Sequence, residues 1–185
     1  MLKTIKNAFK IKEVRDKILF TFAMLVVIRL GSQLPLPGIN SEVFKQWYET
    51  YFQAEAFSFF DAVTGGSFEK MSILALSISP YITSSIIMQL LTIAIPFLEE
   101  LQKDGVDGRK KIASITRYVT VGLSLVQATA MTIGFGNQGL LTKYDAFNVI
   151  TCIVALTAGS AFLMWIGDQI TEKGVGNGIS VVLVI

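Results

Sequence analysis

The chain has 185 residues, of which 52% are hydrophobic and only 16% carry a charge, whereas about a quarter are charged in ordinary soluble domains. So much apolar sequence cannot all be buried inside one domain of this size, so part of it must face lipid. There is no histidine and only one cysteine, Cys152, which excludes histidine-based triads, zinc sites and internal disulfides. These counts predict a membrane protein, and the helix-length apolar stretches described below predict an all-α polytopic one.

Residues 1–17 form a basic segment that precedes the first apolar stretch. Leu2, Ile5 and Phe9 fall near one face of a helix whose other positions include lysines. This pattern is typical of an amphipathic segment lying on an anionic cytoplasmic leaflet. A disordered basic tail is the alternative interpretation.

Four apolar stretches are each close to or above the roughly 20 residues that cross a bilayer as a helix. They are 18–36, 71–97, 114–135 and 146–167. A fifth stretch, 179–185, would extend only about 10 Å as a helix, against a hydrocarbon core of about 30 Å. We therefore expect either that the chain is a fragment or that another chain completes this span.

The distribution of lysine and arginine predicts the orientation of these spans. Twelve of these residues fall in the N-terminal segment, in the segment 98–117 that follows the second span and in the connection after the fourth span, and three fall in the other connections. The connection 98–113 is predicted to be a basic loop carrying Arg109, Lys110 and Lys111. Because positive residues favour the cytoplasmic side, we expect the N-terminus in the cytoplasm.

A short aromatic and small-residue cluster lies between the first two spans, at 57–67. Its residues are Phe57, Phe59, Phe60, Asp61, Ala62, Val63, Thr64, Gly65, Gly66 and Ser67. The cluster is too short to span, so it fits either a re-entrant piece surrounded by protein or an interfacial loop helix. Composition alone favours the interfacial helix.

Arg29 is the one charged residue near the middle of a predicted span. It falls about 16 Å into the first span, where an exposed charge would cost at least several kcal/mol, so we expect it to face the bundle interior. The spans contain no Asp or Glu. This weakens the hypothesis of an ion-coupled carrier, because such carriers commonly use carboxylates near the midplane.

The second span mixes hydroxyl side chains with aliphatic ones around Pro80. The general interpretation is a small-residue packing interface, and the sharper one is a wall shared with water. Ile78 and Ile82, at i and i+4, would project together. In the third span Gln127 must form a hydrogen bond to another helix.

Several motifs in chain order together resemble the SecY family of protein-conducting channels. They are RLGS at 29–32, PLPG at 35–38, SPYITSSIIMQLL at 79–91, DGRKKI at 107–112, TRY at 116–118, FLMW at 162–165 and DQITEKGVGNGIS at 168–180. The resemblance covers essentially the whole chain, and the last block is highly specific. It implies a channel of ten helices built from two inverted five-helix halves, of which this chain would be the N-terminal half.

The resemblance also implies roles for individual residues. Ile78, Ile82 and Leu183 match a hydrophobic pore ring in which Leu183 replaces the family's usual isoleucine. Residues 57–67 match a plug in the outer funnel, which reverses the preference for an interfacial helix. Thr83 and Gln127 match polar positions of a lateral gate.

The function implied is translocation of unfolded preproteins across the cell (inner) membrane and lateral release of transmembrane segments into lipid. Implied partners are the C-terminal half or a second copy of the chain, SecE- and SecG-like subunits, the SecA motor or the ribosome, signal peptides, nascent chains and lipid. The resemblance implies that the protein is not an enzyme and binds no cofactor, metal or sequence-specific nucleic acid. Half of a small-solute secondary carrier remains the alternative function.

Overall fold

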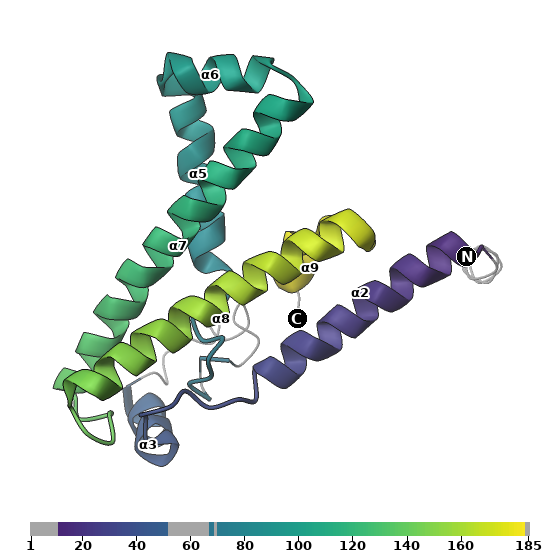
Figure 1. Cartoon of the computed structure of the whole chain (residues 1–185). Helices are drawn as coiled ribbons and strands as arrows, with labels where there is room; N and C mark the ends of the chain where they lie inside the picture. The colour runs from purple at the N-terminus through teal and green to yellow at the C-terminus, as the bar shows by residue number, and fades with distance from the viewer. Residues whose placement is uncertain (1–10, 52–66, 69, 184–185) are drawn as a thin grey trace.

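The computed structural model describes residues 11–51, 67–68 and 70–183 (Figure 1). This part of the chain is helical, joined by turns and short irregular segments. Its helices are α2 (Lys12–Gly31), α3 (Ser41–Tyr51), α5 (Ser79–Ala94), α6 (Pro96–Lys103), α7 (Val106–Asn137), α8 (Ala146–Lys173) and α9 (Gly178–Leu183).

The helices α7 and α8 are long and apolar enough to cross a membrane. α8 begins at the predicted residue and runs six residues beyond the predicted end, and α7 begins eight residues before its predicted start. The two helices pack against each other as an antiparallel hairpin (Figure 1). Apolar length therefore predicted these two spans well, although it underestimated how far each helix continues past the apolar part.

The first predicted span, 18–36, differs from the helix that contains it. α2 starts at Lys12 and ends at Gly31, and Pro35 and Pro37 lie in the irregular segment that follows. Proline cannot continue a helix without losing a backbone hydrogen bond, which explains the early end. The apolar part, 18–31, extends only about 21 Å, less than the roughly 30 Å of a hydrocarbon core.

The second predicted span, 71–97, is not one helix. Residues 71–78 form consecutive turns, α5 begins at Ser79 with Pro80 in its first turn, and α6 begins at Pro96. The axes of α5 and α6 differ by 99°, and the pair is long and apolar enough to span only when taken together. Proline is favoured in the first turn of a helix, where no backbone donor is needed, so each proline marks a helix start.

The predicted basic loop 98–113 is mostly helical. α6 covers residues up to Lys103 and α7 starts at Val106, with Gly105 at φ 74° making the turn between them. Glycine adopts this left-handed conformation without steric cost. Figure 1 shows α5, α6 and α7 as the three sides of a triangle, in which α6 connects the upper ends of the other two.

The turns at 71–78 are enclosed by protein. The backbone N–H of Leu36 donates to the carbonyl of Met71 at 2.9 Å, and that of Ile73 donates to the carbonyl of Leu34 at 3.1 Å. On the opposite side, Gly159 of α8 lies so close that a Cβ there would collide with the Ile73 carbonyl oxygen. Irregular backbone is tolerated at membrane depth only where protein satisfies its polar groups, and these contacts meet that condition.

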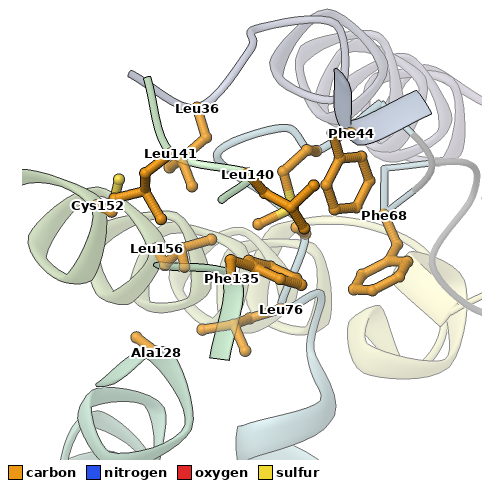
Figure 2. Close-up of a cluster of buried hydrophobic side chains, with 12 residues drawn as sticks. Leu36, Phe44, Phe68, Leu76, Ala128, Phe135, Leu140, Leu141, Cys152 and Leu156 are labelled. Carbon is orange, nitrogen blue, oxygen red and sulfur yellow. The ribbon is translucent and has the colours of Figure 1, made fainter. Parts of the chain in front are cut away.

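A cluster of buried side chains, here called the aromatic cluster, joins the loops at one end of the α7–α8 hairpin (Figure 2). It consists of Leu36, Phe44, Phe68, Met71, Ala75, Leu76, Ala128, Phe135, Leu140, Leu141, Cys152 and Leu156. The Phe44 ring is fully buried and lies 5.4 Å from the ring of Phe135 and 5.9 Å from that of Phe68, both edge to face. These directional ring contacts fix α3 against the hairpin.

The hydroxyl groups of α5 and α7 are largely used within their own helices. Ser84 donates to the carbonyl of Pro80 at 2.7 Å, and Thr92 donates to that of Met88 at 2.6 Å. Both side chains are buried, and α5 packs against α7. This arrangement fits the small-residue packing interface, because hydroxyls satisfied in this way need no water.

Candidate functional site

The three residues matched to a pore ring lie in one buried cluster, here called the aliphatic cluster. Its core is Ile28, Leu74, Ile78, Leu163, Ile166, Ile170 and Val182, and the partly buried side chains of Ile82, Leu183 and Tyr81 are among those packed against it. Ile78 directly precedes α5, Ile82 is in its first turn, and Leu183 ends α9. The cluster is thus built where the start of α5 and the end of α9 meet α8.

The three residues are not equivalent within this cluster. Ile78 is 1% exposed, so its side chain is enclosed by this chain alone. Ile82 and Leu183 are half-buried and keep part of their surface free. Only the latter two can therefore contribute aliphatic surface to a space outside the chain.

The glycine-rich turn before α9 allows that helix to approach α8 closely. A Cβ on Gly178 would collide with the carbonyl oxygen of Gly167. The Gly178 N–H donates to the Thr171 hydroxyl at 2.9 Å, and that hydroxyl donates to the Gly167 carbonyl, also at 2.9 Å. Glycine permits this backbone contact, so α9, which ends at Leu183, can lie directly against α8.

Thr83 and Gln127, the predicted lateral-gate residues, lie on helices that pack together. Thr83 of α5 is exposed, whereas its neighbour Ser84 is buried. Gln127 of α7 is half-buried, next to the fully buried Ala128. The structure therefore gives Thr83 an exposed position on α5 and Gln127 a partly buried one on α7.

Arg29 lies in the last turn of α2, with its side chain exposed on this chain. Its predicted position in the middle of a span is corrected, because the helix ends two residues later. The chain's own helices do not bury it, in contrast to the expected interior position. A cation at the C-terminal end of a helix interacts favourably with the helix dipole.

Arg109, Lys110 and Lys111 are exposed and occupy the first turns of α7 instead of a loop. Lys110 Nζ lies 3.9 Å from Asp107 Oδ1 of the same helix. These three residues therefore form a basic helical surface beside α6. Their positions are compatible with the predicted basic surface, while the predicted loop conformation is wrong.

Of the predicted plug residues, only Ser67 belongs to the part of the chain that the structure describes; 57–66 lie outside it. Ser67 is buried, and its carbonyl accepts a hydrogen bond from the Ser72 N–H at 2.9 Å. Ser67 is thus held by the enclosed turns that lead into α5. In the described residues there is no group of three or more potential metal-ligating His, Cys, Asp or Glu side chains.

Sequence reasoning missed an ion pair between Arg117 of α7 and Asp168 of α8, 2.9 Å from Nε to Oδ2. Both residues belong to quoted motifs, but nothing in the sequence pairs them. The available signal was that each is a charged residue close to one end of an apolar stretch. In an antiparallel hairpin, such ends come together.

Comparisons with known proteins agree with this architecture. The SecY family model matches residues 72–185. The protein translocase subunit SecY of Halalkalibacterium halodurans is 45% identical over 99% of this chain and 42% of its own length, and that of Pseudomonas aeruginosa is 43% identical over 94% and 39%. The chain thus spans about two fifths of the length of these curated relatives.

Solved structures show the same fold at low sequence identity. Sec61 in the canine ribosome-channel complex matches 97% of this chain and 40% of its own chain, with a TM-score of 0.62 and 19% identity. The structure of a protein conducting channel gives the same TM-score and identity over 97% and 39%. The prediction of an all-α membrane fold that corresponds to part of the translocation channel is confirmed. With a matching family model and close relatives along nearly its whole length, the chain belongs to the SecY family.

Proposed function

We propose that this chain forms about half of the wall of a protein-conducting channel. The channel would pass unfolded preproteins across the membrane and release apolar segments sideways into lipid. The observation that carries the proposal is the convergence of Ile78, Ile82 and Leu183 in the aliphatic cluster of a SecY-family chain. The proposal involves no covalent chemistry.

The chemistry of the cluster suits a constriction that must seal and yet yield. Aliphatic side chains exclude a continuous water column by dewetting, and they present no charge that would select among passing polypeptides. Ile78 is buried in the cluster against which Ile82 and Leu183 pack, and so supports them. The half-buried Ile82 and Leu183 would present their free surfaces to the pore. The matching half of the ring would come from the remainder of the channel or from a second copy.

We further propose that the exposed face of α5 near Thr83 borders the lateral gate, with Gln127 beside it. Residues 57–67 would be the plug, with Ser67 as its fixed end. Thr83 is exposed next to a buried packing face, which suits contact with helices outside this chain. Arg29 is exposed at the end of α2. Its side chain would face the same helices outside this chain.

The proposed location is the cell membrane, with the N-terminus and the basic surface of Arg109, Lys110 and Lys111 in the cytoplasm. Proposed partners are SecE- and SecG-like subunits, and SecA or the ribosome as the source of the translocating chain. The bias of basic residues toward one set of connections supports this orientation.

The test is the ion leak of the resting channel in membranes that contain the chain with its native partners. Replacing Ile82 and Leu183 by glycine removes the aliphatic surface that faces the pore. Ile78 is left unchanged because its loss would also damage the core. We expect the double variant to leak ions about tenfold more than the parent, because the dewetted seal is lost.

The matched control is Ile86→Gly, one turn after Ile82 on α5 and 53% exposed. It carries the same helix cost as Ile82→Gly alone, about 1 kcal/mol, without touching the aliphatic cluster. If the double variant leaks no more ions than the control, Ile82 and Leu183 do not form the ring. Crosslinking to an arrested nascent chain, set beside uptake of small solutes, would separate this function from that of a solute carrier.

A further inference from the structure

Arg117 and Asp168 connect α7 to α8 far from the turn that joins these helices. The Asp168 side chain is 26% exposed and that of Arg117 is 52% exposed. The other ion pairs between described residues each join neighbours within one helix. This pair is therefore different in kind, because it connects two separate helices.

Between this pair and the turn, α7 buries mainly small side chains. They are Thr120, Ser124, Ala128 and Thr132. Small side chains let helices approach closely, but they interdigitate less than large ones do. The aromatic cluster lies at the turn of the hairpin, and the charged contact lies at its open end.

At the level of Asp168, α8 also carries the elements of the proposed ring on another face. Gly167, the preceding residue, contacts the Gly178 backbone of α9 and faces the Ile78 side chain. Ile166 and Ile170, which flank Asp168, are fully buried members of the aliphatic cluster. A shift of α8 relative to α7 at this level would therefore move the cluster relative to α7.

Tyr81 connects the pair to α5. It is in the first turn of α5, between Ile78 and Ile82, and packs against the aliphatic cluster near the pair. The pair also forms part of the wall of a cavity of about 470 Å³ lined by α8 residues such as Trp165 and Glu172. Three helices thus meet at one charged contact directly beside the aliphatic cluster.

We propose that Arg117 and Asp168 are a positioning pair that fixes α7, and with it the α5–α6–α7 triangle, against the aliphatic cluster. Removing either partner leaves the other charge partly desolvated and uncompensated, which favours separation of the helices. The consequence for sealing rests on the proposed channel function. The consequence for helix position does not.

The first measurement is the distance between spin labels on α7 and α8 in the membrane-embedded complex. Ser114→Cys and Lys173→Cys, both at exposed positions, carry the labels in a Cys152→Ala background. Arg117→Ala and Asp168→Ala should each broaden the distance distribution about twofold, and the charge swap R117D/D168R should restore it. Arg117→Lys keeps the charge and should stay near the parent, which covers the case in which an alanine variant does not fold.

The control is Lys110→Ala, which removes a positive charge of α7 whose partner, Asp107, is in the same helix. It should leave the distribution unchanged. An Arg117→Ala distribution as narrow as the parent's would overturn the proposal. So would a charge swap as broad as the single variants, because mere loss of packing is not rescued by exchanging charges.

The second measurement is the resting ion leak of the same variants beside the Ile82→Gly/Leu183→Gly channel. A leak that rises in Arg117→Ala and falls again in the charge swap supports the positioning role. If only the Ile82→Gly/Leu183→Gly variant leaks, the positioning role of the pair is overturned, while the proposed channel function is still supported. If the distance distribution broadens but no variant leaks, the proposed channel function is contradicted. The distance result would then still support the positioning role of Arg117 and Asp168.

Discussion

The aromatic and aliphatic clusters are built differently although both are buried. In the aromatic cluster, Phe44 makes edge-to-face contacts with two other rings, and backbone hydrogen bonds such as that from Leu36 to Met71 tie its loops together. The aliphatic cluster combines branched side chains from α2, α5, α8 and α9, and its contacts are non-directional. Directional contacts resist sliding, so the first cluster is suited to be a fixed base, whereas the second leaves aliphatic surface of Ile82 and Leu183 free at its edge.

The largest expected effect concerns the side of the membrane on which each end of the hairpin lies. Lys143 follows Leu140 and Leu141 of the aromatic cluster, whereas Lys110 lies at the other end of α7. Cysteines at 110 and 143 in a Cys152-free background should therefore differ almost completely in labelling by an impermeant maleimide added outside, with 143 labelled. Equal labelling from one side would contradict the proposed orientation.

Phe44→Ala should be the most damaging single change in the aromatic cluster. The ring is fully buried, so the substitution leaves a cavity and should lower the free energy of unfolding by about 3–5 kcal/mol. Denaturation in detergent, followed by the fluorescence of Trp47, measures this loss. Ile86→Ala, at an exposed position, should lower the free energy of unfolding far less. Similar losses for both variants would mean that the ring contacts of Phe44 contribute no particular stability.

A smaller loss is expected where α8 touches the enclosed turns. Gly159→Ala places a Cβ against the Ile73 carbonyl oxygen and should cost about 1–3 kcal/mol, because the backbone must move. Gly122→Ala on α7 is the matched control. Its Cβ meets no atom within 4 Å, so it should stabilise the chain by up to about 1 kcal/mol through helix propensity. The same unfolding assay should give opposite signs for the two variants; equal signs would contradict the close contact.

The smallest effect is expected at Ser77, which has a φ of 52° just before the aliphatic cluster. A left-handed conformation costs a residue with a Cβ roughly 1–2 kcal/mol, and glycine avoids this cost. Ser77→Gly should therefore leave the free energy of unfolding unchanged or raise it by up to about 1 kcal/mol, after the greater flexibility of unfolded glycine is included. Ser77→Ala retains the strain and should show no gain.

The sequence was sufficient for features that depend on local composition. The predicted spans 114–135 and 146–167 lie within α7 and α8 because a long apolar stretch has few alternatives to a helix in lipid. The family resemblance then named Ile78, Ile82 and Leu183, which the fold brings into one cluster. Their role in sealing stays a prediction.

Features that depend on tertiary contacts could not be predicted. The turns at 71–78 are as apolar as a helix would be, and their conformation depends on contacts with Leu34, Leu36 and Gly159. The pairing of Arg117 with Asp168 depends on the register of the hairpin. The hydroxyls of α5 suggested either packing or water, and Ser84 and Thr92 are buried and bonded to their own helix.

The complete enclosure of Ile78 has an evolutionary consequence. A side chain surrounded by its own chain is selected for shape, so position 78 should accept only residues of nearly the same volume and branching. Ile82 and Leu183 keep free surface and are selected for what they meet outside the chain. Exchanges among Ile, Leu, Val and Met should therefore be common at 82 and 183 in functional sequences and rare at 78.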